Sequence, residues 1–319
     1  MARPSDPPPG PLPPAGPEAP SPPAAPPWTV TGRARALLRA SRPKQWLKNL
    51  LVFAAPGAAG QLGDPDALGR TAAVFVVFCI AASGTYLLND VRDVDRDREH
   101  ERKRHRPVAA GALPVGWAAA AGVLLIAAAL AAAIAAGGRP VLAVLTAYLV
   151  LTGAYTAVLK SVTVCDIIAV AGCHVLRALA GAVAIGVPVT SWFLIVVSLA
   201  ALLVVTGKRE AELRGPAGTR TRATLARYTV SYLTQVRTMV SGALIVTFCL
   251  WALDGSGTGD PLPFRAASIV PFIACVLRYH MLVDRGIGEE PEEIALRDRG
   301  LQLGVLSLLI LVGLGAHLG

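Results

Sequence analysis

Long apolar runs, separated by short polar or charged stretches, constrain this chain more than any other feature. Hydrophobic residues make up 54% of the 319 residues and charged residues only 16%, whereas about 25% of the residues of soluble domains are charged. An apolar run of about 20 residues is long enough to cross a bilayer as a helix. The sequence therefore predicts an all-α polytopic membrane protein. About nine runs qualify as membrane spans, at residues 46–62, 70–88, 112–136, 141–159, 164–185, 192–206, 229–252, 265–283 and 301–318.

Basic residues are distributed unevenly among the connections between these runs. Residues 89–111, 207–228 and 284–300 carry seven, six and three Lys and Arg residues, whereas the alternate connections carry almost none. Lys and Arg gather in cytoplasmic loops, so this asymmetry predicts a plasma-membrane protein whose charged loops face the cytoplasm. The same distribution accounts for the formal net charge of +9 without nucleic-acid binding, which we do not expect.

One charged stretch, Asn89–Gly111, combines a pattern of carboxylates with a basic run. Asp90, Asp93 and Asp97 are spaced i, i+3, i+7, so in a helix they share one face, and Asp95 falls on another. Carboxylates on one face repel one another unless cations lie between them. Hard divalent ions, above all Mg²⁺, prefer such oxygen ligands and commonly bridge them to substrate phosphates. The spacing therefore predicts a Mg²⁺ site formed by the three aspartates.

Basic residues follow directly behind these carboxylates, at Lys103, Arg104 and Arg106. Guanidinium and ammonium groups bind phosphate oxygens that a metal leaves free, so these three residues are candidate phosphate ligands. The alternative is a solvated loop with internal ion pairs. The one-sided spacing of the carboxylates at the end of an apolar run favours a binding site.

Further polar residues lie at the ends of the apolar runs, or inside them, on the same predicted side. Lys48 and Asn49 begin the first run, either as interfacial anchors or as phosphate ligands. Arg177 lies inside the fifth run, where an arginine normally faces a polar cavity or a carboxylate. Lys208 and Arg209 end the sixth run, either as helix caps or as an anion clamp. The remaining candidates, near the end of the fourth run, are Tyr155 and Lys160.

The stretch Asn89–Asp97 reads NDVRDVDRD and resembles the NDxxDxxxD signature of the UbiA superfamily of intramembrane prenyltransferases. The number of predicted spans and the side of the charged loops agree with this resemblance. It implies a nine-helix bundle with a Mg²⁺-diphosphate site at its cytoplasmic end. Asp90, Asp93 and Asp97 would bind the metal there, supported by Asn89.

Within the superfamily the chain is most similar, over residues 40–318, to members that transfer phosphoribose to a polyprenyl phosphate. The likeness rests on the stretches RPKQWLKNLLVFAAP, KRHRPVAAG, YTAVLK and GKREAEL. It implies transfer of 5-phosphoribose from 5-phosphoribosyl 1-diphosphate to decaprenyl phosphate, with release of diphosphate, for cell-wall arabinan synthesis. Lys103, Arg104 and Arg106 would then hold the donor. The lipid phosphate or the ribose 5-phosphate would be held by a further set, Lys48, Tyr155, Lys160 and Arg177.

Two alternative functions use the same residues differently. A UbiA-type prenyltransferase that moves an isoprenoid from its diphosphate to an aromatic or polar acceptor would use the same carboxylates. The second Asp-rich motif typical of such enzymes is replaced here by Tyr155, Lys160 and a lone Asp166, which argues against this reading. A transporter would line an anion path with Arg177 and Arg237, but the polar groups gather on one side of the membrane rather than along a path.

The domain organisation follows from the composition along the chain. Residues 1–27 contain thirteen prolines, which predicts a disordered tail. Residues 28–45 predict a basic interfacial segment, and residues 46–319 are expected to form the transmembrane catalytic domain. The expected partners are the soluble diphosphate donor, the lipid phosphate and the bilayer. The sequence is also compatible with a homo-oligomer.

Overall fold

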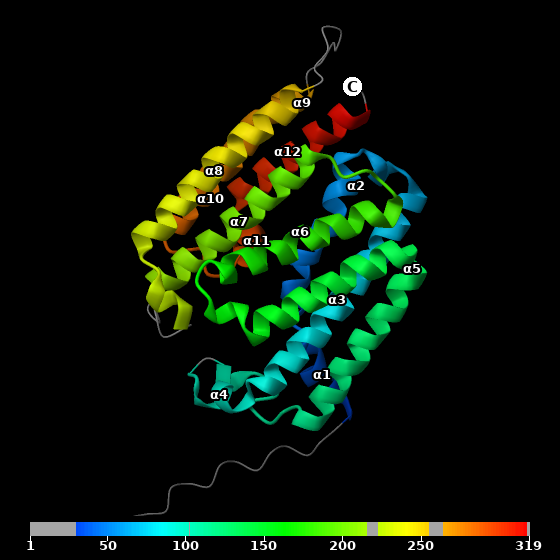
Figure 1. The fold of residues 1–319 in the computed structure, drawn as a ribbon, viewed down its shortest axis with the longest axis vertical. Coiled ribbons are helices and arrows are strands. Elements are labelled where there is room, and N and C mark those ends of the chain that lie inside the picture. The colour runs from blue at the N-terminus through cyan, green and yellow to red at the C-terminus, as the bar shows by residue number, and fades with distance from the viewer. Residues whose placement is uncertain (1–29, 102, 216–222, 255–263, 318–319) are drawn as a thin grey trace, which may run out of the picture.

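The computed structural model describes residues 30–101, 103–215, 223–254 and 264–317, so the predicted Pro-rich tail lies outside the described residues. Every regular element in these ranges is a helix (Figure 1), in agreement with the predicted all-α class. The α-helices are α1 (Val30–Ala40), α2 (Ala54–Ala58), α3 (Pro65–Arg92), α4 (Val94–Glu99), α5 (Val115–Ala157), α6 (Cys165–Ile185), α7 (Ser191–Arg214), α8 (Val230–Leu253), α9 (Phe264–Ala267), α10 (Ile269–Asp284), α11 (Pro291–Arg297) and α12 (Arg299–His317). The 3₁₀ helices are η1 (Pro43–Phe53), η2 (Gln61–Gly63), η3 (Lys103–His105), η4 (Leu159–Ser161) and η6 (Ala223–Arg227).

Seven helical segments in the described part of the chain are long and apolar enough to cross a membrane. They are α3, α5, α6, α7, α8, the α9–α10 segment and α12. The 43 residues of α5 include both the third and the fourth predicted runs, and the helix is broken at Gly137 and Gly138. Gly138 has a φ of +69°, which glycine adopts without steric cost. Figure 1 shows the two arms that meet at this break. The chain is a multi-pass membrane protein, as predicted.

The first predicted span, residues 46–62, is wrong as a single membrane-spanning α-helix. These residues fall instead in η1, α2 and η2. Pro43 opens η1, and Pro56 lies within α2, where it cannot donate a backbone hydrogen bond. The η1 segment packs against α3 and α6 inside the bundle and buries Asn49 and Val52. An apolar run indicates that the segment is buried, but it does not distinguish one long α-helix from shorter helices packed between neighbouring helices.

A close backbone approach joins η1 to α6 at Gly181. A Cβ atom placed on Gly181 would lie 1.7 Å from the Val52 carbonyl oxygen, so no larger residue fits without moving η1. One turn earlier on α6, Nε of Arg177 donates to Oδ1 of Asn49 at 2.7 Å. Because Gly181 has no side chain, the backbone of η1 can lie directly against α6. This close contact fixes the position of the polar side chains on η1.

Replacing Gly181 by Ala is expected to destabilise the protein by about 3 kcal/mol, because the added methyl group meets backbone rather than a flexible side chain. The loss would appear as a lower thermal unfolding midpoint of the purified protein in detergent. Gly242→Ala on α8 is the matched control, since a Cβ there meets no heavy atom within 4 Å, and its midpoint should not fall. Equal midpoints for the two variants would contradict this account of the η1–α6 contact.

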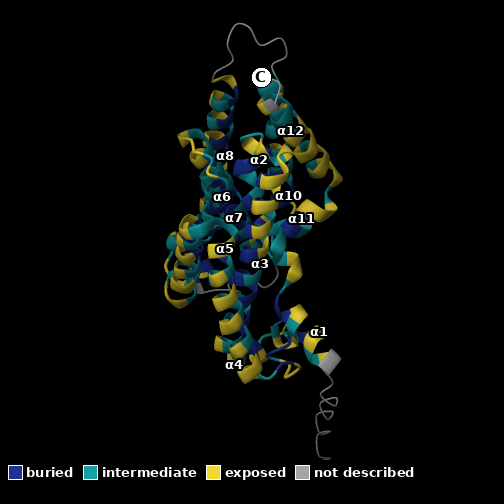
Figure 2. Ribbon diagram, turned by 90° about the vertical axis from the view of Figure 1, so that its right-hand side faces the viewer, coloured by how far each residue is buried: buried dark blue, intermediate teal, exposed yellow. Residues whose placement is uncertain are grey.

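The charged connections meet near one end of the bundle. Nζ of Lys160, in η4, lies 3.9 Å from Asp93, and Oγ1 of Thr224, in η6, donates to the Lys160 carbonyl at 3.3 Å. Figure 1 places α4 at the lower end of the molecule and α9 with the described carboxyl-terminal end at the upper end. Much of the ribbon of the outer helices belongs to exposed residues (Figure 2). The exposed residues of α12 include the apolar Leu303 and Leu309, as expected of surfaces that face lipid.

Candidate active site

The predicted carboxylates lie where α3 passes into α4. Asp93 ends α3 and precedes α4, with φ −97° and ψ 10°, so the three aspartates do not share one unbroken helix as expected. The helical hydrogen bonds nevertheless continue through the break, from the Asp93 amide to the Asn89 carbonyl at 3.0 Å and from the Asp97 amide to the Asp93 carbonyl at 2.8 Å. Asp90 and Asp97 are therefore both buried and face the same arginine.

Two guanidinium groups lie against these buried carboxylates. Nη1 of Arg106 donates to Oδ2 of Asp97 at 2.7 Å and to Oδ1 of Asp90 at 3.3 Å. Arg42 donates to the same oxygen of Asp90, and its guanidinium lies over the ring of Tyr86, 5.1 Å from the centroid. Arg106 was a predicted site residue, whereas Arg42 was not. The signal for Arg42 was its place at the start of the stretch RPKQW that carries part of the family resemblance.

The other two aspartates of the stretch differ sharply in their surroundings. The side chain of Asp93 is 27% exposed, and Oδ2 lies 3.9 Å from Nζ of Lys160. The side chain of Asp95 is 88% exposed and forms an ion pair only 2.9 Å long with Arg98, three residues further on. The structure therefore separates Asp95 from the buried carboxylates, as the spacing predicts, and brings Lys160 to Asp93.

The carboxylates at the α3–α4 junction are chemically suited to a hard cation. Oδ2 of Asp90 is buried and accepts no hydrogen bond from any described residue, so one carboxylate oxygen remains available inside the site. Carboxylate oxygens are the ligands that Mg²⁺ prefers. In the described part of the chain, however, no three acidic, His or Cys residues converge closely enough to hold a metal by themselves. Arg106 lies between Asp90 and Asp97 and pairs with both carboxylates.

A second polar group joins η1 to the last charged connection. Nζ of Lys48 lies 2.6 Å from Oε1 of Glu292, the second residue of α11, and the charges of Arg177 and Arg42 also act on Lys48. Burial by itself would raise the pKa of Glu292, but the charges of Lys48 and Lys208 hold this pKa below its usual value. The Glu292 carboxylate is therefore ionised at neutral pH. Sequence reasoning missed this residue, since α11 lies in an acidic stretch without a recognisable pattern.

Arg177 is buried and bonded only to neutral groups. Nε donates to Oδ1 of Asn49 at 2.7 Å, Nη1 to the Cys173 carbonyl at 2.8 Å and Nη2 to the hydroxyl of Tyr148 at 3.0 Å. No carboxylate in the described residues forms an ion pair with it. Asn49 orients Arg177 and also donates to Sγ of Cys79 at 3.2 Å. The structure thus joins the predicted residues Asn49 and Arg177, and among the described residues no anionic group compensates the charge of Arg177.

Arg209 has the opposite surroundings, although it follows Lys208 directly. Its guanidinium donates to Asp166 at 2.9 Å, to Glu212 at 3.0 Å and to the Tyr155 hydroxyl at 3.3 Å. Its side chain is only 2% exposed, so two carboxylates already compensate its charge. Nζ of Lys208 lies 3.9 Å from Glu212, and the Lys208 side chain is one-quarter exposed. Arg209 and Tyr155 therefore form a partly buried contact, and Lys208 is the more accessible cation of the two adjacent basic residues.

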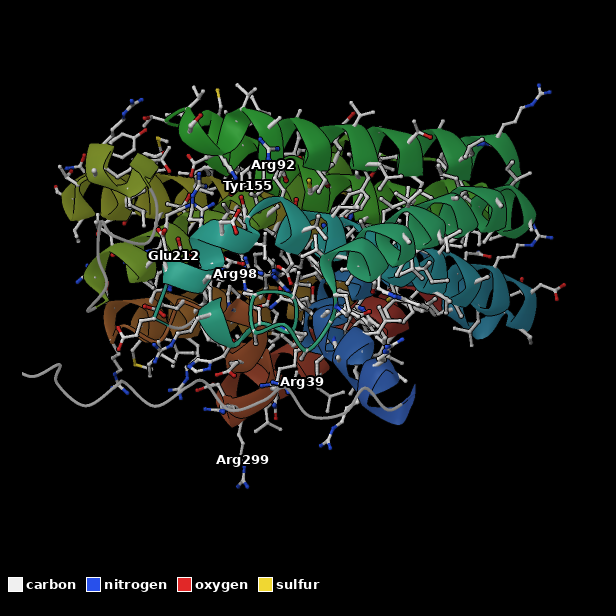
Figure 3. The ribbon with its side chains drawn as sticks, turned by 90° about the horizontal axis from the view of Figure 1, so that it is seen from below. Arg39, Arg92, Arg98, Tyr155, Glu212 and Arg299 are labelled. Atoms are coloured by element: carbon white, nitrogen blue, oxygen red, sulfur yellow. The ribbon has the colours of Figure 1, made fainter. Side chains whose placement is uncertain are left out.

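The remaining predicted residues lie close to the carboxylates along the chain but less deeply. Asn89 precedes Asp90 on α3 and is half-buried. Lys103 is half-buried in η3, where its amide donates to Nδ1 of His100 at 3.4 Å. Arg104 is exposed, and its guanidinium contacts His105. Seen from the end that carries α4 (Figure 3), Arg299 points away from the bundle, whereas Tyr155 and Glu212 lie within its outline.

The anion path of a transporter finds no support at Arg237. Its side chain is 1% exposed, and its guanidinium pairs with Glu210 at 2.7 Å and with Asp284 at 2.8 Å. It also contacts Nδ1 of His280 at 2.6 Å. These partners tie α7, α8 and α10 together, so Arg237 holds the second half of the bundle rather than offering a free charge to an anion.

A helical membrane bundle with buried carboxylates and basic groups at one end has the architecture of an intramembrane transferase. The sequence model of the UbiA prenyltransferase family matches residues 50–295, and the chain belongs to this family. A solved UbiA homologue from Archaeoglobus fulgidus, bound to GPP and Mg²⁺, has the same fold, with a TM-score of 0.65 at 17% identity over 88% of this chain and 99% of that chain.

Two curated relatives are more similar in sequence. The decaprenyl-phosphate phosphoribosyltransferase of Corynebacterium glutamicum is 40% identical over 291 residues, which cover 89% of this chain and 88% of the relative. The enzyme of the same name from Mycobacterium tuberculosis is 41% identical over 289 residues, which cover 89% of this chain and 95% of the relative.

Proposed function

We propose that this chain transfers 5-phosphoribose from 5-phosphoribosyl 1-diphosphate to decaprenyl phosphate and releases diphosphate on the cytoplasmic side of the membrane. The observation that carries the proposal is 40% and 41% identity, over 89% of the chain, to two decaprenyl-phosphate phosphoribosyltransferases. The site supports it, because carboxylates suited to Mg²⁺ lie beside several basic groups. The concentration of Lys and Arg in the loops at this end supports the cytoplasmic orientation.

The three carboxylates, together with Arg42 and Arg106, would bind the diphosphate of the donor. Asp90, Asp93 and Asp97 would hold Mg²⁺, which neutralises the charge that develops on a departing diphosphate. Arg106 and Arg42, already at these carboxylates, would contact phosphate oxygens that the metal leaves free. During the reaction the bond from ribose C1 to the diphosphate oxygen breaks, and its electron pair leaves with the diphosphate.

The basic groups on η1, η4, α6 and α7 would hold the remaining phosphates. Arg177 is a buried cation without an anionic partner in the described residues, which suits the lipid phosphate or the ribose 5-phosphate. Lys48, Lys160 and Lys208 supply further positive charge, with Lys103 at the donor end. A phosphate oxygen of the lipid forms the new bond to C1. This oxygen is ionised at neutral pH, so the protein needs no general base and acts by positioning and charge compensation.

The test is transfer of labelled phosphoribose into a lipid-extractable product. Purified protein in detergent would receive labelled 5-phosphoribosyl 1-diphosphate, decaprenyl phosphate and Mg²⁺. The expected result is a labelled lipid, whose formation EDTA abolishes and Asp93→Asn lowers by about 100-fold or more. The absence of labelled lipid, together with consumption of a prenyl diphosphate and an aromatic acceptor, would replace the proposal with prenyl transfer.

A further inference from the structure

Glu292 is a buried carboxylate set among the cations that would receive phosphates. Its side chain is 6% exposed, and Oε1 lies 2.6 Å from Nζ of Lys48. Lys48 therefore occupies Oε1, whereas no described side chain donates a hydrogen bond to the buried Oε2 of Glu292. Lys208 also acts on Glu292 electrostatically. Buried carboxylate oxygens normally accept hydrogen bonds, so Oε2 has acceptor capacity that the described side chains do not fill.

A negative group in a site for anionic substrates needs a chemical reason. It repels phosphates, and a site built for phosphates alone would be stronger without it. Ionised carboxylates accept strong hydrogen bonds from hydroxyl groups, and the two oxygens of one carboxylate, each with two lone pairs, match two adjacent hydroxyls. Among the substrates of the proposed reaction, the ribose ring carries such a pair, at C2 and C3. The isoprenoid chain of a prenyl diphosphate offers no hydroxyl to this group.

The position of Glu292 fits a sugar held between two phosphate sites. Arg42 donates to Asp90 at the predicted diphosphate site and also acts electrostatically on Lys48. Lys48 in turn lies against Glu292. The ribose of the donor has its diphosphate on C1 and its other phosphate on C5, so a donor with its diphosphate at the aspartates and its 5-phosphate near Lys48 or Arg177 would bring the ring toward Glu292.

We propose that Glu292 determines donor specificity by accepting hydrogen bonds from the 2- and 3-hydroxyls of the ribose. This inference rests on the proposed function and names the part of the donor that the α11 segment recognises. Glu292 holds Lys48 in place before the donor binds and receives the two hydroxyls when it binds. The residue thereby favours a phosphoribosyl donor over a prenyl diphosphate at a site whose carboxylate pattern would serve either.

The experiment compares two donors with the full-length wild type and two neighbouring variants. The donors are 5-phosphoribosyl 1-diphosphate and its 2,3-dideoxy analogue, with decaprenyl phosphate as acceptor. The variants are Glu292→Gln, which keeps the size of the side chain and removes its charge, and Glu293→Gln. Glu293 is the matched control, because its side chain is one-third exposed and pairs with Lys44 at 3.4 Å. For each donor, dividing the kcat/KM of a variant by that of the wild type removes the different intrinsic reactivity of the two donors.

Glu292→Gln is expected to lower kcat/KM for the ribosyl donor by about 10- to 100-fold, because hydrogen bonds to a charged group are lost. For the dideoxy donor the same variant should stay within about threefold of the wild type. Glu293→Gln should stay within about twofold for both donors. An unchanged thermal midpoint of Glu292→Gln would exclude misfolding as the cause of the loss.

Two outcomes would overturn the inference and leave the proposed function intact. Equal losses for both donors would mean that Glu292 acts only by positioning Lys48, since the loss of that ion pair affects every anionic donor alike. No loss for either donor would mean that Glu292 has no part in donor binding. Wild-type protein that forms no phosphoribosyl lipid under these conditions would instead refute the proposed function itself, and the inference with it.

Discussion

Asp90→Asn is expected to lower phosphoribosyl transfer by about 1,000-fold or more. The side chain of Asp90 is 2% exposed and meets both Arg42 and Arg106, and its second oxygen is a buried acceptor without a described partner. In the proposed reaction, the amide would keep the shape but remove an anionic ligand of Mg²⁺, so the charge of the metal and of the departing diphosphate would be compensated less well. The measurement is the initial rate of labelled lipid formation over a range of Mg²⁺ concentrations.

Asp95→Asn is the control that the chain itself offers. Asp95 lies in the same acidic run, but its side chain is 88% exposed and pairs only with Arg98 among the contacts described here. Exposed ion pairs contribute little, so this variant should stay within about twofold of the wild-type rate. Similar rates for Asp90→Asn and Asp95→Asn would show that the run acts through its overall charge, which would refute a specific site at the α3–α4 junction.

Much of the fold could be predicted because each apolar run is long and is ended by charges, glycine or proline. All runs but the first correspond to α-helical arms, and the turn between the third and fourth runs falls at Gly137 and Gly138. Residues 46–62 could not be predicted as well. Their 3₁₀ geometry depends on packing against α3 and α6 and on the glycine at position 181, neither of which is encoded in the run itself.

For the candidate site too, the sequence predicts contacts between residues of one stretch but not contacts between distant stretches. The common position of Asp90 and Asp97 beside one arginine could be predicted in part, because the i, i+7 spacing is local to one stretch. Arg42 could not, since it meets Asp90 across 48 positions, and in the sequence it reads as part of an interfacial basic segment. Glu292 was missed for the same reason, because its partner Lys48 lies on the first polar segment of the bundle. Pairing across the bundle is decided by topology, which the residue pattern alone does not give.

Lys208 and Arg209 show most directly that neighbours in the sequence can have different partners across the bundle, and a large effect on stability is expected at Arg209. Adjacent in the sequence, both were predicted to bind substrate. Arg209→Met is expected to destabilise the protein by about 3–5 kcal/mol, because it removes the guanidinium shared by the buried carboxylate of Asp166 and the partly buried carboxylate of Glu212. The measurement is the thermal unfolding midpoint in detergent, together with the yield of monodisperse protein.

Lys208→Met separates the structural role of Arg209 from a role in substrate binding. The Lys208 side chain is one-quarter exposed and lies 3.9 Å from Glu212, so its loss should leave the midpoint nearly unchanged. If Lys208 holds a phosphate, the variant should instead raise KM for a substrate by about 10-fold. The contrary pattern, a stable Arg209→Met protein with a raised KM, would make Arg209 a substrate ligand. In that case its contacts with Asp166 and Glu212 would have to open when substrate binds.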